Sequence, residues 1–265
     1  MSSYVNFTQV YDTSENRSIS YLSAIYGNFS YLKSSIHSIL SCDINPHLIS
    51  SKVVLLKPNW VTHSKNESDE LCLRTHDNVL LATLEIVLEC NPKKVIIGDA
   101  PIQGGVWGKI LNATLISEIE KRSDLYQIPV SIVDFRRRLF NPYKNMVYDD
   151  QNSINEYIIF DLGKNSLLEP ITTSNKNKFR VILYNSDGFE DTHIPGMHKY
   201  CITKKIVESD VIISLPKIKT HQRTCMTGAL RNIVGLNGDK DFLPHHRQGG
   251  TDKGGDCYAG KSILK

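Results

Sequence analysis

The stretch VVLLKPNW, residues 53–60, starts with four apolar residues and becomes polar at Lys57-Pro58-Asn59. A short, continuous apolar run is typical of a strand that is buried on both faces of a parallel sheet. Proline cannot donate a backbone hydrogen bond, so Pro58 is expected to end the strand. The stretch therefore predicts a central sheet strand that presents polar side chains just past its end.

The residues that follow complete a strand–helix–strand unit. Apolar positions at helical spacing predict a helix over residues 77–89, with Asp77 as its N-cap. Its inward positions are Val79, Leu80, Ala82, Thr83, Ile86 and Val87. Asn91-Pro92 ends this helix, and residues 95–97 form the next strand. Strands joined by a helical crossover pair in parallel, so the predicted fold class is α/β, a mostly parallel sheet of βαβ units.

The rest of the chain extends this pattern and adds one irregular inserted segment. Further helices are predicted over residues 105–122 and 199–209, and further strands over residues 129–134, 157–160, 179–184 and 210–214. Residues 136–178 are polar and irregular, and we expect them to form an insertion beside the sheet.

The chain is expected to divide into two parts. Residues 1–50 are polar and weakly patterned, with one amphipathic helix near residues 31–40, and are expected to form an N-terminal extension. Residues 51–265 are expected to form the α/β domain. The final residues, YAGKSILK, look like the first turn of a helix, so we expect the chain to be truncated or to lack a second domain.

The composition is that of a globular protein without an extreme charge. A net charge of +3 over 265 residues is too small to indicate nucleic-acid binding. No apolar run approaches the roughly 18 residues of a membrane span, and the first residues lack a signal-peptide pattern. The six cysteines occur singly, which argues against a disulfide scaffold, a zinc ribbon or an iron–sulfur cluster made by this chain alone. The sequence predicts a reduced, cytoplasmic protein.

Polar residues follow three of the predicted strands at the point where each strand ends. These groups are Lys57-Pro58-Asn59, Gly98-Asp99-Ala100-Pro101 and Pro216-Lys217-Ile218-Lys219-Thr220-His221. Open parallel sheets bind ligands at the carboxyl ends of their strands. We therefore expect the three groups to meet in one site, although each could instead be an ordinary solvated loop.

The segment SLPKIKTHQRTCMTGALRNIVG, residues 214–235, is rich in groups that bind anions. Lysine and arginine side chains pair with carboxylates and phosphates, and a helix capped by Thr227 would add free backbone N–H groups. The predicted anion-binding residues are Lys57, Asn59, Lys217, Lys219, Thr227, Arg231 and Asn232, with Thr220, Arg223 and Thr224 as further donors. The alternative interpretation is a basic, solvated surface.

Three titratable residues are candidates for proton transfer. They are His221, Asp99 and His245, the last in a glycine-rich segment, residues 245–256, that is expected to close over a ligand. Asp99 could instead bind a metal or a ribose hydroxyl, or be a simple turn residue. The histidines, including His193 and His198, fit no familiar zinc spacing, so no metal ligands are predicted. A P-loop, a G-x-G-x-x-G stretch and a nucleophile elbow are all missing from the sequence.

Together these motifs resemble a known family. VLLKPNW, VIIGDAP, SDVIISLPKIKTH, MTGALRNIVGLNGDK and the later PHHR are similar to motifs of the bacterial and archaeal family called domain of unknown function 362, over residues 53–265. The positions carried over are Lys57, Pro58, Asn59, Asp99, Pro216, Lys217, Lys219, His221, Thr227, Gly228, Asn232, Gly235 and His245. Arg231 stands where the family usually has lysine.

The resemblance implies a site but not a reaction. Some members of the family carry a ferredoxin-like domain with clustered cysteines, which this chain lacks, and others look as though they belong to polysaccharide gene clusters. We expect an enzyme that binds a small anionic or phosphorylated substrate, including a sugar-linked one, but the sequence leaves enzymatic activity open. The alternative is a non-catalytic anion-binding or redox-partner module that works with an iron–sulfur protein.

A lesser alternative is a cofactor site similar to that of lactate racemase. No cofactor is identified from the sequence. The expected partners are a small anionic ligand and a redox or biosynthetic protein, and neither nucleic acid nor a membrane is expected to bind.

Overall fold

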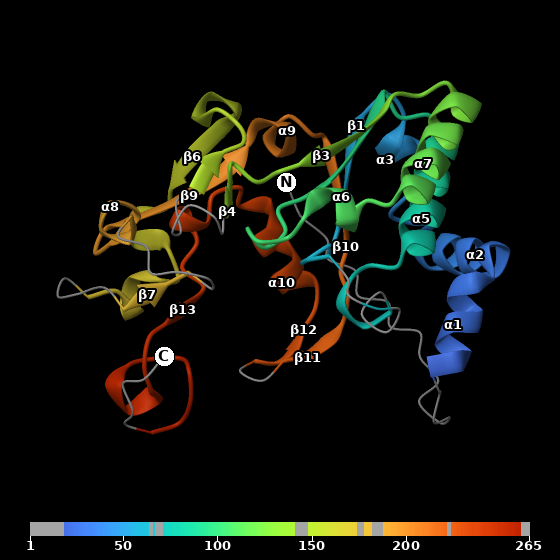
Figure 1. Cartoon of the computed structure of the whole chain (residues 1–265). Coiled ribbons are helices and arrows are strands. Elements are labelled where there is room, and N and C mark those ends of the chain that lie inside the picture. Colours follow the sequence, from blue (N-terminus) through green and yellow to red (C-terminus); the bar gives the residue numbers. More distant parts are fainter. Residues whose placement is uncertain are drawn as a thin grey trace.

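A four-stranded parallel sheet forms the centre of the computed structural model (Figure 1). Its strand order is β10 (Val211–Leu215), β1 (Val53–Pro58), β2 (Lys94–Asp99) and β3 (Val130–Asp134). The structure describes residues 19–63, 66, 71–140, 148–173, 178–181, 188–221 and 224–260. The predicted α/β fold class with a parallel sheet is confirmed.

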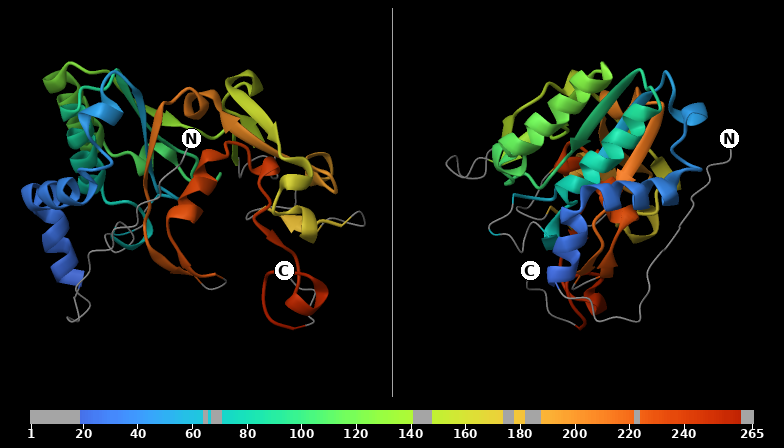
Figure 2. Two further views of the ribbon diagram at one scale, coloured as in Figure 1. Left: turned by 180° about the vertical axis from the view of Figure 1, so that it is seen from behind. Right: turned by 90° about the vertical axis from the view of Figure 1, so that its right-hand side faces the viewer.

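Helices cover one face of this sheet, as Figures 1 and 2 show. Helices α3 (Pro46–Ile49), α5 (Asp77–Glu89) and α7 (Ala113–Tyr126) lie nearest the strands, and α1 (Ile19–Gly27) and α2 (Phe29–Leu40) pack outside them against α5. Leu80 and Leu84 of α5 are fully buried in one cluster with Val54 and Leu56 of β1. Helix α2 lies against α5, where the Lys33 ammonium contacts Glu85 and Glu89. Part of the segment before residue 51 therefore belongs to the same core.

The opposite face of the sheet carries a smaller layer. Leu55, Ile96 and Phe135 form a second buried cluster with Ile206. Ile206 lies in α9 (Lys204–Val207), and the layer beyond it contains a three-stranded antiparallel sheet, β6 (Tyr157–Asp161), β9 (Met197–Thr203) and β8 (His193–Ile194). The inserted segment also contains β4 (Arg138–Phe140), β5 (Tyr148–Asp150), η1 (Ile154–Glu156), η2 (Gly163–Asn165) and η3 (Glu169–Ile171). Helix α8 (Phe189–Thr192) precedes β8.

The chain after β10 begins at the carboxyl end of the central sheet with β11 (Lys219–His221), β12 (Cys225–Thr227) and α10 (Ala229–Ile233). It continues through η4 (Val234–Leu236), η5 (Lys240–Phe242), β13 (His246–Arg247) and η6 (Thr251–Lys253), and the earlier strand β7 (Phe179–Arg180) lies beside β13. Strands β11 and β12 form an antiparallel hairpin beyond the end of β10, and β13 pairs with β7. In Figures 1 and 2, α10 lies between the central sheet and the smaller layer.

Several predicted elements differ from the structure. The single helix predicted over residues 105–122 is wrong, because α6 (Trp107–Ile110) and α7 are separated and the Asn112 side chain caps α7. The helix predicted over residues 199–209 is also wrong at its start. Residues 199–203 belong to β9 and pair with β6, and pairing between strands overrides a local helical pattern.

Three predicted details at element ends also need correction. His76, not Asp77, is the N-cap of α5, because its Nδ1 atom accepts from the Asn78 N–H. The N-cap of α10 is Gly228, so Thr227 does not cap that helix. The strand predicted over residues 179–184 is observed only as β7, and residues 182–187 lie outside the described residues, as do Arg223 and the final turn at 261–265.

Two observations on the described residues concern the protein's surroundings. No helix among them is long and apolar enough to cross a membrane. All six cysteines fall within the described ranges, and none is in a disulfide.

Candidate functional site

A buried ion pair joins the ends of two neighbouring strands. The Lys57 Nζ atom lies 2.6 Å from the Asp99 Oδ1 atom, and both side chains are almost fully buried. The other carboxylate oxygen of Asp99 accepts from the Trp60 N–H at 2.8 Å. Burial lowers the pKa of Lys57, and the charge of Asp99 opposes this shift. The two predicted strand ends therefore do meet, as sheet topology required.

Helix α10 and the turn after it close over this pair. The Asn232 side chain accepts from Lys57 Nζ at 3.0 Å and donates to the Lys57 carbonyl oxygen at 3.0 Å. Gly235 passes so close that an added Cβ atom would lie 2.1 Å from Asp99 Oδ1 and 2.7 Å from Lys57 Nζ. Only glycine fits at this position without displacing the ion pair.

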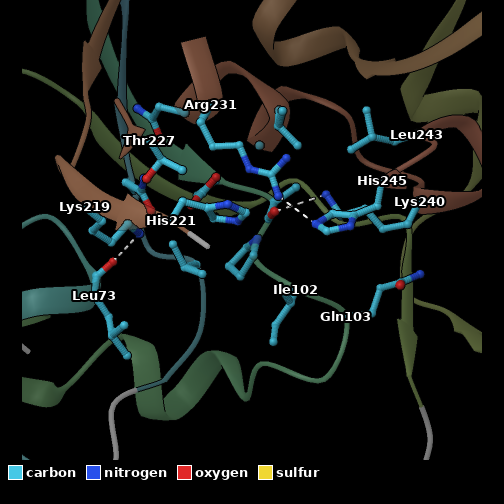
Figure 3. Close-up of a pocket in the computed structure, with 18 of the residues that line it drawn as sticks. Leu73, Ile102, Gln103, Lys219, His221, Thr227, Arg231, Lys240, Leu243 and His245 are labelled. Carbon is cyan, nitrogen blue, oxygen red and sulfur yellow. Dashed lines mark hydrogen bonds between the residues drawn. The ribbon is translucent and has the colours of Figure 1, made fainter. Parts of the chain in front are cut away.

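A cavity of about 380 Å³ opens above the pair (Figure 3). A volume of this size lies within the usual range for small-molecule sites. Its polar lining residues are Lys57, Asn59, Asp99, Gln103, Lys219, Thr220, His221, Thr227, Arg231, Asn232, Lys240 and His245. Among the described residues that line the cavity, Asp99 is the one carboxylate, and it is already paired with Lys57.

Three further cations line the cavity without a carboxylate contact among the described residues. The Lys219 ammonium donates to the Leu73 carbonyl oxygen at 2.7 Å. The Lys240 ammonium donates to the carbonyl oxygens of Ala100 and Asn237 at 3.3 and 3.1 Å. Arg231 contacts a histidine, described below. Carbonyl oxygens satisfy the N–H groups but leave the positive charge uncompensated, so the cavity favours an anion.

Burial makes two of these lysines easier to deprotonate. The pKa of Lys219 is lowered to about 8, first by burial and then by the charges of Lys217 and Arg231. The pKa of Lys240 is also lowered to about 8 by burial, with Asp99 opposing the shift. An anion in the cavity would favour the charged form of both side chains.

Arg231 and His245 point toward each other across the cavity (Figure 3), with 2.7 Å between Nη2 and Nε2. Arginine can only donate hydrogen bonds, so the His245 Nε2 atom must be the acceptor. The proton of a neutral His245 ring is then on Nδ1, which lies 3.2 Å from the His246 Nδ1 atom. His245 is therefore held in one tautomer by its two neighbours.

The Thr227 hydroxyl is an unusual polar group in this lining. Thr227 is buried, and its Oγ1 atom has no hydrogen-bond partner among the described residues. A buried hydroxyl without a partner costs free energy unless a ligand or water completes it. The residue ends β12 and lines the cavity, so a ligand oxygen there would meet a ready hydrogen-bonding group.

Most of the predicted site residues come together. The cavity lining contains Lys57, Asn59, Asp99, Lys219, His221, Thr227, Arg231, Asn232 and His245. Lys217 does not line it, because its ammonium lies over the Tyr26 ring, 5.3 Å from the centroid. Lys217 and Lys219 are two positions apart, so a regular strand through both would place them on the same face. Strand β11 begins only at Lys219, and the sequence alone does not show that Lys217 lies outside it.

Sequence reasoning missed Gln103, Lys240 and the aliphatic residues of the lining. Lys240 is the last residue of the family motif MTGALRNIVGLNGDK. Its place in this motif, near Arg231 and Asn232, was the one sequence feature that could have marked it as a site residue. The aliphatic residues of the wall come from separate loops and carry no signal of their own; they are Val61, Leu73, Ile102, Val181, Val234 and Leu243.

A second titratable cluster lies away from the cavity. His193 and His198 are fully buried, with 3.2 Å between their Nδ1 atoms. The His193 Nε2 atom lies 3.1 Å from the Phe242 carbonyl oxygen, and His198 Nε2 lies 2.9 Å from the Glu169 carboxylate. Within the described ranges, no three His, Cys, Asp or Glu side chains are arranged to hold a metal ion.

Comparison with known proteins gives one match. Residues 168–263 match the family described as Domain of unknown function (DUF362). The chain resembles this family. The DUF362 match contains Lys219, Thr227, Arg231, Lys240 and His245 but not the ends of β1 and β2. Neither a curated protein nor a solved structure matches the chain.

Proposed function

We propose that this chain is an enzyme that binds a small anionic substrate in the cavity at the carboxyl ends of its strands. Lys219, Arg231 and Lys240 hold the anion, and Thr227 donates to or accepts from it. His245 and His221 are the proton carriers. Carboxylates and phosphates, including phosphates of sugars, belong to the class of ligand proposed here.

One observation carries the proposal. Lys219, Arg231 and Lys240 face a single cavity, and their described hydrogen bonds go only to carbonyl oxygens or an imidazole nitrogen. Three neighbouring positive charges repel one another, and burial increases that cost. An anion would remove the cost, which gives the site a physical reason to bind one.

The contact between Arg231 and His245 supports a route to proton transfer. The His245 lone pair at Nε2 accepts from the Arg231 guanidinium. An anion that draws the guanidinium away frees this nitrogen to accept a proton from the bound substrate. Asp99 is a weaker candidate for a base, because both of its carboxylate oxygens already accept hydrogen bonds. We assign Asp99 the role of holding Lys57.

Isothermal titration with inorganic phosphate, acetate and succinate tests the proposal. At least one probe should bind the protein, and Lys219→Met and Arg231→Met should each weaken that binding by at least about tenfold, the usual effect of losing a charge-assisted hydrogen bond. Lys121→Met removes the same charge from an exposed position on α7 and is the matched control. Equal losses in all three variants would point to a general charge effect and would refute the site.

The other roles expected from the sequence stay predictions. A redox-partner module that works with an iron–sulfur protein would bind that protein without turning over a small anion. A cofactor similar to that of lactate racemase would copurify with the protein and give it an absorbance. We also propose a cytoplasmic location, supported by six cysteines that form no disulfide within the described part of the chain.

A further inference from the structure

We propose that the ligand of this cavity is an anion with an aliphatic body, such as a medium-chain carboxylate or an alkyl phosphate. This inference rests on the proposed function and narrows its substrate class. It rests on the aliphatic residues of the lining, which binding of an anion alone does not require.

Aliphatic side chains form a large part of the cavity wall. They come from six separate places in the fold: Val61 after β1, Leu73 before α5, Ile102 after β2, Val181 after β7, Val234 in η4 and Leu243 after η5. Pro101 and Ala100 extend the same wall. Apolar surface in a cavity gains free energy when a ligand displaces water from it.

Charged and aliphatic side chains share the lining of the cavity. Figure 3 shows Leu73 and Ile102 across the cavity from Thr227 and Arg231, with Lys219 beside Leu73 and Gln103 beside Ile102. The ligand therefore needs an anionic end and an apolar end. A small inorganic anion would leave the aliphatic wall in contact with water. A neutral hydrocarbon would leave the cations without a negative partner.

The same wall disfavours sugars and nucleosides as the ligand body. Sugar hydroxyls need hydrogen-bonding partners, and burying a hydroxyl against hydrocarbon costs free energy. Sugars and bases also bind on aromatic rings, and no Phe, Tyr or Trp is among the described residues that line the cavity. A sugar phosphate would place part of its polar surface against Val61, Leu73 and Ile102.

The test is a series of straight-chain carboxylates with an identical head: acetate, butyrate, hexanoate and octanoate. Isothermal titration gives the affinity of the longer members, and displacement of octanoate gives that of the shorter ones. The affinity is expected to rise by up to about fourfold for each added methylene until the wall is covered. Glucose 6-phosphate and inorganic phosphate are measured beside the series, and glucose 6-phosphate is expected to bind no more tightly than inorganic phosphate.

Wall variants locate the chain-length effect. Leu243→Ala and Ile102→Ala each remove aliphatic surface from the wall without removing a charge. Each is expected to lower the ratio of octanoate affinity to acetate affinity by at least about fourfold. The two residues lie in different loops, so a folding defect in one variant would not affect the other. Far-ultraviolet circular dichroism checks that each variant keeps its secondary structure.

The outcomes separate the two proposals. Binding of acetate or phosphate that is lost in Arg231→Met, but with no gain along the series, would leave the proposed function standing and overturn the aliphatic body. Tighter binding of glucose 6-phosphate than of octanoate would also overturn it. Absence of binding by every probe would refute the proposed function and this inference with it.

Discussion

Lys57 and Asp99 face each other at the carboxyl ends of β1 and β2, with 2.6 Å between their charged atoms. The pair lies under α10, where Asn232 hydrogen-bonds to Lys57 at both its ammonium and its carbonyl group. The ion pair therefore anchors the C-terminal segment to the sheet and forms the floor of the cavity.

Lys57→Met is expected to destabilise the fold by about 3 to 5 kcal/mol, because it leaves the Asp99 carboxylate buried without its cation. Urea unfolding at neutral pH measures the change in the free energy of unfolding.

The double variant Lys57→Met/Asp99→Asn is the control for the previous prediction. It removes both charges, so a large part of the lost stability should return. Asp99→Asn alone completes the cycle. If the losses of Lys57→Met and Asp99→Asn simply add in the double variant, the pair has no electrostatic coupling and its assigned role is wrong.

Gly235→Ala should be as damaging as a change in the ion pair itself. Its Cβ atom would fall within 2.1 Å of Asp99 Oδ1, so the carboxylate or the turn has to move. Gly108→Ala in α6 is the matched control, because nothing lies within 4 Å of its added Cβ atom. We expect thermal unfolding to show a large loss for Gly235→Ala and no loss for Gly108→Ala. Similar melting temperatures for both would contradict the close approach described above.

Thr227→Val should separate stability from binding. Valine removes a buried hydroxyl that has no partner among the described residues, so the free energy of unfolding should stay the same or rise by about 1 kcal/mol. Affinity for an anionic probe should fall by up to about tenfold, because one hydrogen bond to the ligand is lost. Thr227→Ser keeps the hydroxyl and should retain the affinity. A stable Thr227→Val protein with unchanged affinity would remove this residue from the site.

Lys217 and Lys219 offer a direct comparison between sequence and structure. The sequence treats the two as equal anion-binding residues, but only Lys219 lines the cavity. Lys219→Met should weaken phosphate or carboxylate binding by at least about tenfold, and Lys217→Met by much less, since it acts only through the charge it places near Lys219. Titration calorimetry on both variants decides the matter, and equal losses of affinity would favour the sequence-based prediction.

The buried His193 should make the fold sensitive to acid. Burial lowers its pKa to about 4, with Asp161 and the Phe242 carbonyl opposing the shift and His198 adding to it. The unfolded chain therefore takes up a proton near pH 6.5 and the folded chain does not. The contribution of neutral His193 to the free energy of unfolding should be fully present above pH 6.5. It should fall by about 2 to 3 kcal/mol as the pH is lowered to 4.5.

Urea unfolding at several pH values measures this loss, and His193→Asn is the comparison because asparagine does not titrate. The loss between pH 7 and 4.5 should be smaller in the variant. The lowered pKa values of Glu169 and Asp161 place their own contribution at more acidic pH. An equal loss in both proteins would show that other groups cause it.

The central sheet was predictable because its strands are short apolar runs whose period and flanking prolines are local signals. The carboxyl ends of parallel strands lie at one edge of the sheet, so the predicted proximity of Lys57 and Asp99 was correct. The β9 strand was not predictable, because its extended form comes from pairing with β6 rather than from its own pattern. The rest was not predictable, because it depends on side-chain directions across distant loops. This holds for the position of Lys217, for the aliphatic wall and for the Thr227 hydroxyl, which lacks a partner in the described part of the chain.

The bond from Asn232 to Lys57 spans 175 positions of the chain. Contacts of such long range form late in folding, because the entropy of closing a long loop has to be overcome first. The floor of the cavity is thus unfinished until α10 has been synthesised and has docked onto β1. An anionic ligand would then bind only molecules that have completed this step, and its binding would report how much of a refolding sample has reached the native state.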